Sequence, residues 1–360
     1  MLEILKIQNE TAIINWNAFA SGVSSICPFS FNPSLAVFYK NHFNWKTYYF
    51  LIYQNGEIRA LLPIINTGKK YVSLPHFSYG GFLVSNHKPE LDSNKIIHSI
   101  INTLQRKNPE SGFFKCKLED IQFDKKTKHK VFIRSLNNYS NVEFIKSDKI
   151  TSLLSLPKST VLFSKAINSN LRRKIKKSLK TGVIVKSGGE ELLNDFYNVY
   201  SRNIYKLKSL NYPKNFFLDL FSSYQNGDIV LFVAYLNDVC VGGGLMASYK
   251  GFFENLFFAT NIDARKYYVS DLLHWNMINS AIEINSKEKS NKHGVYSFGR
   301  SSIQSGVHKF KKHWPVTDYP LYNYPNMLKY NNYNLLPKLW GFLPYCISKP
   351  LGTKLIEHIY

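Results

Sequence analysis

Short apolar runs separated by tight-turn residues recur along the chain and predict a protein rich in β-strands. In residues 46–65, the runs KTYYFLIY and IRALLPII flank QNGE, whose Asn-Gly pair is typical of a hairpin turn. Residues 229–248 repeat this plan, because IVLFVAY and VCVGGGLMAS are joined through a Leu-Asn-Asp turn. A Tyr-Lys-Gly turn at residues 249–251 then leads into FFENLFFAT. We therefore expect one strand–turn–strand unit to occur twice.

Apolar residues at helical spacing follow each of these units. Residues 91–107 and 270–284 carry apolar side chains at intervals of three and four, which predicts a helix in each segment. Further strands are expected at residues 71–75 and 295–300. Three consecutive glycines at 242–244 fall inside a predicted strand, which indicates a bulge or close packing of the backbone.

The order of these elements predicts the fold class and the domain organisation. Strands and helices alternate twice, so we expect an α/β protein with two related domains in tandem, each a mixed sheet with flanking helices. The length of 360 residues agrees with two domains. We expect the first domain to span residues 1–160 and the second residues 161–330, followed by a tail at residues 331–360.

A stretch without acidic residues, 149–189, lies between the two halves. Within it, NSNLRRKIKKSLKTG predicts a helix over residues 168–182, capped by its first polar residues and ended by Gly182. Its expected apolar stripe consists of Leu171, Ile175 and Leu179. On the other faces of the helix, each pair of like charges four residues apart destabilises the helix by roughly a few tenths of a kcal/mol. A bound phosphate would turn this repulsion into a net attraction. Two interpretations stay open, a phosphate-binding face and a solvated one.

Composition and charge indicate a folded protein with anionic partners. The chain has 46 Lys+Arg against 24 Asp+Glu, a net charge of +22, which favours nucleic acid, phosphorylated small molecules or an anionic membrane face. A hydrophobic share of 44% excludes a disordered chain. The four cysteines show no CxxC spacing, the N-terminus lacks a signal-peptide pattern, and no apolar run reaches the roughly 18 residues of a spanning helix. We expect a cytoplasmic protein that can contact the membrane peripherally.

Standard catalytic motifs are missing from the sequence. There is no GxxxxGK[ST], no GxGxxG after a strand, no GxSxG and no HExxH, and the scattered histidines predict no metal site. The sequence therefore favours chemistry by positioning and electrostatic stabilisation. Acyl transfer to an amine fits, because an activated donor needs only N–H donors or a cation near its oxyanion. Residues 296–314, YSFGRSSIQSGVHKFKKHW, supply small residues and cations in a predicted loop after a strand.

The same segment resembles the FGRS…G…FK..W signature of FemAB-like proteins in the GNAT-like acyltransferase superfamily. SLPHFSYGG, NLRRKIKKSLKTGVIVK, SLNYPKNFF and YVSDLLHWNMINSAI resemble further family elements in the same order, so the likeness covers nearly the whole chain. LPKLWGFLPYCISKPLGTKL is similar to tails of the exopolysaccharide- and exosortase-associated subgroup. The resemblance implies two tandem GNAT-like acyltransferase domains. It also implies transfer of an aminoacyl or acyl group to an amine of a cell-envelope precursor, peptidoglycan or surface polysaccharide.

The resemblance carries individual site residues as well. Phe310-Lys311 matches the family's FK pair, whose lysine is linked to catalysis, so Lys311 is expected to stabilise the oxyanion. Arg300 and Ser301 match the FGRS pair, and we expect Arg300 to be the second catalytic group and Ser301 to contact substrate. The remaining residues expected at the substrate are Phe310, then Arg172, Arg173 and Lys177 on the basic helix, and Tyr79, Gly80 and Gly81 in a cleft wall.

Two departures from the family pattern bear on the donor. Pro315 follows Trp314 where the family usually has Gly, and NIDARKYYVSD stands where the GNAT pyrophosphate loop, Q/RxxGxG/A, is usual. The second departure favours aminoacyl-tRNA over acyl-CoA as co-substrate, and we expect no tightly bound cofactor. The expected partners are a phosphorylated or nucleotide- or lipid-linked acceptor, tRNA, and the inner membrane face.

Three alternative functions stay open. The first is an acyl-CoA-dependent N-acyltransferase of the GNAT superfamily. The second is a nucleic-acid-binding module without catalysis, which would rest on the two basic clusters. The third is a peripheral membrane scaffold acting through the apolar residues 335–347 and the basic face.

Overall fold

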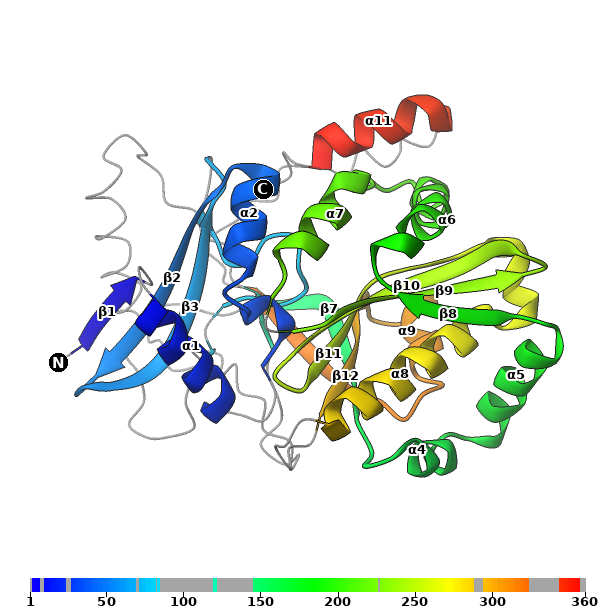
Figure 1. The fold of residues 1–360 in the computed structure, drawn as a ribbon, viewed down its shortest axis with the longest axis horizontal. Coiled ribbons are helices and arrows are strands. Elements are labelled where there is room, and N and C mark those ends of the chain that lie inside the picture. Colours follow the sequence, from blue (N-terminus) through cyan, green and yellow to red (C-terminus); the bar gives the residue numbers. More distant parts are fainter. Residues whose placement is uncertain are drawn as a thin grey trace.

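A computed structural model of the chain shows two β-sheets side by side, with helices packed around them (Figure 1). The structure describes residues 2–6, 10–23, 27–68, 71–81, 83–84, 119–121, 145–225, 227–287, 294–323 and 343–356. The predicted α/β class is confirmed, and the larger sheet is mixed as predicted, whereas the described strand pairs of the smaller sheet are all antiparallel. The helix predicted at residues 91–107 lies outside the described residues.

The smaller sheet comes from the N-terminal part of the chain. Its strands run in the order β1-β2-β3-β4, with β5 also paired to β3, and all pairs are antiparallel. These strands are β1 (Leu2–Lys6), β2 (Lys46–Gln54), β3 (Glu57–Asn66), β4 (Tyr71–Val72) and β5 (Leu83–Val84). The predicted hairpin is confirmed, because Asn55 and Gly56 join β2 to β3 with positive φ angles of 53° and 79°.

The larger sheet has the order β6-β13-β7-β12-β11-β10-β9-β8. Its strands are β6 (Glu119–Ile121), β7 (Ile145–Ser155), β8 (Ile184–Gly188), β9 (Ile229–Leu236), β10 (Val239–Tyr249), β11 (Phe252–Thr260), β12 (Val295–Ser302) and β13 (Thr317–Asn323). β11 and β12 are parallel, and the other pairs are antiparallel. Both β6 and β7 precede the predicted domain boundary at residue 160. Strand pairing therefore joins segments from before that boundary to the second half of the chain.

Helices cover both faces of the larger sheet. In Figure 1, α6 and α7 lie on one side of it, and α4, α5 and α8 lie on the other. The helices of the C-terminal part are α4 (Thr160–Ala166), α5 (Ser169–Lys180), η2 (Glu190–Leu192), α6 (Leu193–Lys206), α7 (Lys214–Ser223), η3 (Ile262–Tyr267), α8 (Val269–Lys287), α9 (Gly306–Lys311) and α11 (Tyr345–Ile356). Beside the smaller sheet lie α1 (Glu10–Val23), η1 (Phe29–Phe31) and α2 (Leu35–Phe43). No helix in the described part of the chain is long and apolar enough to cross a membrane.

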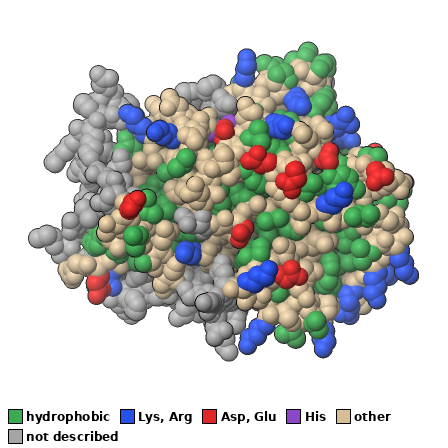
Figure 2. Space-filling model, viewed as in Figure 1, with side chains coloured by type: hydrophobic (Ala, Val, Ile, Leu, Met, Phe, Trp, Pro, Cys, Tyr) green, Lys and Arg blue, Asp and Glu red, His purple; other side chains and the backbone are tan. Residues whose placement is uncertain are grey.

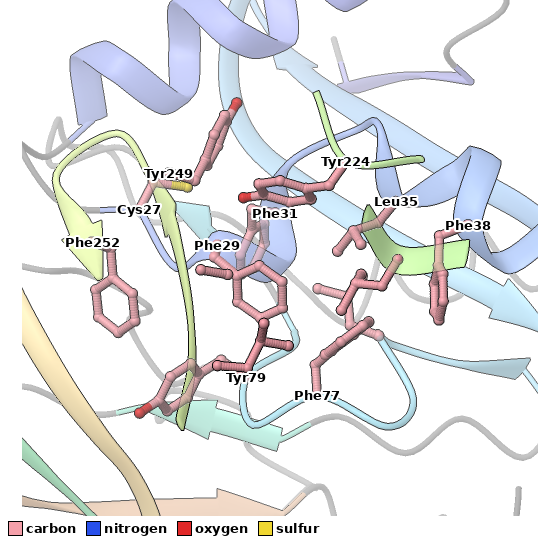
Figure 3. Packing of buried hydrophobic residues seen from close by; sticks show 14 of the residues in the cluster. Cys27, Phe29, Phe31, Leu35, Phe38, Phe77, Tyr79, Tyr224, Tyr249 and Phe252 are labelled. Carbon is pink, nitrogen blue, oxygen red and sulfur yellow. The ribbon is translucent and has the colours of Figure 1, made fainter. Parts of the chain in front are cut away.

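One aromatic-rich core joins the two halves. Phe29 from the N-terminal part packs against Tyr224 from the C-terminal part, with ring centroids 5.8 Å apart (Figure 3). Phe38 packs against Phe216 in the same way, with ring centroids 5.1 Å apart. All four side chains are buried. Hydrogen bonds cross the same boundary, for example from Asn32 Nδ2 to the carbonyl oxygen of residue 225 at 2.6 Å. The halves therefore share a core and do not fold as two separately packed bodies.

The three glycines of β10 let helices approach the sheet from both faces. A Cβ on Gly243 would lie 2.8 Å from the ring of Phe196 in α6, and one on Gly244 would lie 2.9 Å from Met277 Sδ in α8. The close backbone packing predicted for residues 242–244 is confirmed.

We expect Gly243→Ala to lower the free energy of unfolding by about 1–3 kcal/mol, because the added methyl group overpacks the contact with Phe196 and with the carbonyl oxygen of Phe232. Urea denaturation followed by circular dichroism measures this loss. Gly22→Ala in α1 is the control, because nothing lies within 4 Å of its added Cβ. Equal midpoints for the two variants would contradict the expectation.

The basic helix forms where the sequence predicts it. α5 begins after Asn168, whose side chain accepts a hydrogen bond from Leu171 N at 2.8 Å, and Gly182 follows its end with φ 82°. Leu171 and Ile175 are buried as predicted. The prediction for Leu179 is wrong: this side chain is 55% exposed, because the buried row curves around the helix to Ser178.

Candidate active site

The parallel strands β11 and β12 pair at one end and part at the other. Residues 252–254 pair with residues 295–297, and beyond them β11 continues beside β10 while β12 continues beside β7. A bulge in β12 between Ser297 and Arg300, with Gly299 at φ 71°, changes the direction of the strand. The sheet therefore opens beside the last paired residue of β11, which is Glu254.

Glu254 is a carboxyl group held in the protein interior. Its side chain is fully buried, and neither carboxylate oxygen makes a hydrogen bond of normal geometry within the described part of the chain. Burial raises the pKa of the Glu254 carboxyl to about 8, while the Ser78 hydroxyl and the cations Arg300 and Lys311 lower it. A carboxyl that titrates near neutral pH can accept and release a proton under working conditions.

Tyr79 reaches this point from the N-terminal half. Its hydroxyl hydrogen-bonds with Thr151 Oγ1 in β7 and with Ser297 Oγ in β12, each at 2.5 Å. Figure 3 shows the Tyr79 hydroxyl pointing out of the apolar cluster in which its ring packs. Burial, and then the nearby charge of Glu254, raises the pKa of Tyr79 well above its usual value, so the hydroxyl stays protonated. Both halves of the chain therefore contribute to the site.

Gly80 and Gly81 shape the turn that follows Tyr79. Gly81 has a φ of 89°, and its N–H donates to Ser73 Oγ at 2.8 Å. A Cβ on Gly80 would lie 2.7 Å from the Ser73 carbonyl oxygen. The group that approaches this backbone is thus Ser73 of the same segment, and the placement of both glycines in a substrate cleft stays a prediction.

Lys311 lies at the end of α9, and only 4% of its surface is exposed. Its Nζ donates to the carbonyl oxygens of Gly299 and Arg300, at 2.7 and 3.1 Å, across the bulge in β12. Burial lowers the pKa of Lys311 to about 8, although the charges of Glu254 and Asp318 raise it. An ammonium group has three N–H donors, so the two carbonyls leave one for another acceptor.

The segment between β12 and β13 differs from its predicted form. The sequence predicted a loop, whereas residues 306–311 form the short helix α9, because the Ser305 side chain caps the backbone N–H of His308 at 3.2 Å. The helix is needed to aim Lys311 back at β12. Phe310 on the same helix lies with its ring 5.6 Å from that of His274.

Arg300 and Ser301 follow the bulge in β12. Arg300 pairs with Thr151 of β7, and its positive charge lowers the pKa of the Glu254 carboxyl. Ser301 is 7% exposed, and its Oγ has no hydrogen-bond partner among the described residues. The structure thus brings Arg300, Lys311 and Tyr79 together around Glu254.

Hydrogen bonds and an ion pair around Asp318 fix α9 to β13. Asp318 accepts hydrogen bonds from Ser152 Oγ at 2.7 Å and His308 Nε2 at 2.9 Å, and Lys312 Nζ lies 3.3 Å away. The backbone N–H of Gln304 donates to His308 Nδ1 at 3.0 Å, which leaves the imidazole proton on Nε2. Burial raises the pKa of Asp318, but the hydrogen bonds from Ser152, His308 and Lys312 lower it by more. Because its imidazole is engaged at both nitrogens, His308 is a positioning residue for α9.

The predicted phosphate-binding residues of α5 lie on different sides of the helix. Arg172 Nη1 donates to the carbonyl oxygens of Ser164 and Ile167 at the end of α4, at 3.1 and 2.9 Å. Arg173 is exposed and donates to Asn170 Oδ1 at 3.0 Å. Arg172 thus holds α4 against α5, and Arg173 stays on the exposed surface.

Lys177 belongs to a group at the start of α8. Its Nζ lies 5.3 Å from the ring centroid of Tyr268, and the Nζ of Lys174 lies 5.8 Å from the same centroid. We call Lys174, Lys177 and Tyr268 the lysine shelf. The shelf borders the site, because Lys174 Nζ also lies 3.5 Å from His313 Nδ1, two residues after Lys311.

The first turn of α8 carries its own carboxyl group. Asp271 is 5% exposed; burial raises the pKa of its carboxyl, while the charges of Lys174 and His313 lower it. Tyr268 precedes the helix in the left-handed region, with φ 56°. A diphosphate at this place would meet lysine side chains and a buried carboxyl, and would lack the glycine-rich backbone cradle of a phosphate loop.

Glu254 is the main site residue that the sequence analysis missed. A signal was present, because Glu254 is the single charged residue of FFENLFFAT, a strand that consists mostly of apolar residues. No group of three or more His, Cys, Asp or Glu side chains that could hold a metal ion occurs in the described ranges.

Comparison with known proteins identifies the second half of the chain. Residues 165–312 match the protein family described as the acetyltransferase (GNAT) domain. No curated protein matches the chain. The segment carrying α5 to α9 is therefore similar to the GNAT acetyltransferase domain.

Solved structures resemble nearly the whole chain in fold. The crystal structure of FemX is 16% identical and covers 93% of this chain and 100% of its own, with a TM-score of 0.61. A tandem GNAT protein from the clavulanic acid biosynthesis pathway is 8% identical and covers 90% and 98%, with a TM-score of 0.53. The structure of L-PGS from Bacillus licheniformis is 14% identical and covers 82% and 90%, with a TM-score of 0.51. The predicted fold of two tandem GNAT-like domains is confirmed.

Proposed function

We propose that this chain transfers an acyl group from an activated ester or thioester to an amine of a cell-envelope precursor. The observation that supports it best is the placement of Glu254 and Lys311 at the opening between β11 and β12. Burial raises the pKa of the Glu254 carboxyl to about 8 and lowers the pKa of the Lys311 ammonium to about 8. A base and a cation that both titrate near neutral pH suit acyl transfer to an amine.

Each group has one part in the reaction. The acceptor ammonium loses a proton to the Glu254 carboxylate, and the free amine nitrogen attacks the acyl carbonyl carbon. The remaining N–H of Lys311 donates to the oxyanion that forms. When the oxyanion collapses, the bond to the carrier breaks, and the leaving thiolate or alkoxide takes up the proton that Glu254 received. The nitrogen then loses its second proton to the Glu254 carboxylate, which releases it to solvent, and a neutral amide remains. Tyr79 holds β7 and β12 together beside Glu254 through its hydrogen bonds with Thr151 and Ser297, and the charge of Arg300 favours the carboxylate form of Glu254.

The acceptor class rests on the FGRS…FK..W pattern. In this chain the pattern places Arg300 and Lys311 beside Glu254, and its resemblance to FemAB-like proteins supports an amine of a peptidoglycan or surface-polysaccharide precursor. Such a precursor carries phosphates, which suits a chain with a net charge of +22.

Two donors are compatible with the lysine shelf. Acyl-CoA is the co-substrate that GNAT domains generally use, and aminoacyl-tRNA is the donor that the missing pyrophosphate loop favours. Either donor would place phosphates near the ammonium groups of Lys174 and Lys177. Because attraction between lysines and phosphates weakens as salt rises, binding of either donor should be salt-sensitive.

Donor retention tests the proposal. Purified protein is mixed with a radiolabelled aminoacyl-tRNA pool and, separately, with labelled acetyl-CoA at two salt concentrations. We expect retention of one donor that falls as salt rises and falls again in Lys174→Ala/Lys177→Ala, whereas Lys186→Ala on the edge strand β8 leaves it unchanged. Retention of tRNA that persists after deacylation would favour the nucleic-acid-binding module, and retention of neither donor would overturn the proposal.

A further inference from the structure

The C-terminal helix α11 buries one row of residues and leaves a neighbouring row of large aliphatic residues exposed. Its inner row consists of Ser348, Gly352 and Ile356, all buried. Its outer row consists of Ile347, Leu351 and Leu355, which are 46%, 41% and 37% exposed. Both rows repeat every four residues, so each follows one face of the helix. We call the outer row the α11 stripe.

Specific contacts hold α11 in this orientation. Tyr345 OH and Ser201 Oγ of α6 hydrogen-bond at 2.7 Å, and Tyr205 OH donates to the Leu343 carbonyl oxygen at 2.9 Å. Lys349 Nζ lies 5.1 Å from the ring centroid of Tyr197. Since these contacts all come from α6, they fix which side of α11 faces outward, and the α11 stripe is a built surface of the fold.

The helix and the end of α6 also carry lysines and one more exposed apolar residue. Residues 343–356 contain Lys349 and Lys354 and no acidic residue. The end of α6, against which α11 packs, adds Lys206 and Leu207, and Leu207 is 63% exposed. In Figure 2 an apolar area with Lys and Arg at its margin lies where Figure 1 places α11, at the upper edge of the molecule.

We propose that the α11 stripe docks on an anionic lipid surface. A short helix with aliphatic residues on its outer face and lysines beside them suits the boundary between headgroups and acyl chains. A second copy of the chain is disfavoured as the occupant, because each copy carries a net charge of +22 and the same lysines at its margin. RNA is disfavoured because exposed aliphatic side chains offer it neither charge nor a stacking surface.

One short helix supplies a weak, reversible attachment, since stable anchoring takes two signals. The inference does not depend on the proposed acyl transfer. If that transfer uses a lipid-linked acceptor, however, docking would bring the site to its substrate. Membrane contact was expected from the apolar residues 335–347. Of these, 335–342 lie outside the described residues, and Ile347 belongs to the α11 stripe.

Vesicle co-sedimentation tests this inference. The full chain is mixed with vesicles of phosphatidylglycerol and phosphatidylcholine and, separately, with vesicles of phosphatidylcholine alone, and the bound fraction is measured. We expect binding to the anionic vesicles that falls at least about tenfold in Leu351→Asp. The control is Val239→Asp, an exposed residue of the β9–β10 hairpin, which should bind as the unchanged chain does. Thermal melting verifies that both variants are folded.

Two other outcomes would overturn the inference. The first is equal binding to both kinds of vesicle, or binding that Leu351→Asp leaves unchanged. The second is a dimer in sedimentation velocity that Leu351→Asp dissociates while vesicles bind nothing, which would assign the stripe to self-association. Acyl transfer is assayed separately with soluble substrates, so failure of either proposal is seen independently of the other.

Discussion

A Glu254→Gln variant is expected to lose about 10²–10⁴-fold in kcat while remaining folded. Gln keeps the shape of the side chain but cannot accept a proton, so the acceptor amine would have to lose its proton to solvent. The unchanged enzyme should show kcat/KM rising as Glu254 ionises near pH 8 and falling as Lys311 loses its proton near the same pH. Steady-state kinetics across this range should show that the variant lacks the rising limb.

The same variant should be more stable than the unchanged protein at neutral pH. Between about pH 4.5 and about 8, buried Glu254 keeps a proton that the unfolded chain has already lost. The folded state then binds more protons than the unfolded state, so stability falls as pH rises through this window. Because Gln does not titrate, this decrease in stability should be absent when the denaturation midpoints of the variant are compared at pH 5 and pH 8.

The matched control is Glu283→Gln, an exposed residue of α8. It should leave kcat and the pH profile unchanged. If Glu254→Gln retained full activity with both limbs of the profile, Glu254 would be a structural carboxyl and the proposed base would be wrong.

Replacing Lys311 by Met is expected to lower kcat by about 10²–10³-fold, because the oxyanion would lose its cationic donor. The descending limb of the pH profile, set by a lysine whose pKa burial lowers to about 8, should disappear with it. That limb separates catalysis from structure: a lysine that served only to bridge the carbonyls of Gly299 and Arg300 would affect stability and would leave the limb in place.

Lys309→Met is the control for this variant, because Lys309 is an exposed residue of the same helix. Circular dichroism and thermal melting show how much stability each variant loses. An active Lys311→Met enzyme with an unchanged alkaline limb would contradict the assigned role, whereas retained binding of tRNA without any turnover in the unchanged protein would favour a binding module.

Local signals in the sequence were sufficient for much of the fold. The polar cap at Asn168, the glycine at 182 and the cations between them define α5 without any long-range contact. Turn residues defined the hairpins in the same way, since Asn237 and Asp238 adopt the positive φ angles, 50° and 61°, that such turns require. Leu179 was misplaced because spacing alone does not show on which side of Ile175 the neighbouring helix α8 packs.

The site depended on information that local patterns do not contain. The FK pair located Lys311, but its orientation comes from a six-residue helix too short to show a periodic pattern. Tyr79 meets Thr151 and Ser297 only because the two halves share a core. Glu254 escaped notice because a strand sequence does not show which of its residues lies where two parallel strands part.

The position of β7 affects how the chain acquires structure during synthesis. β7 leaves the ribosome long before its partners β12 and β13, which come from residues 295–323. Until those residues emerge, a nascent β7 has two unpaired edges, and unpaired edges are templates for aggregation. The larger sheet is therefore completed only after residues 295–323 have emerged, and the nascent protein should depend on chaperones that shield β-edges throughout that interval.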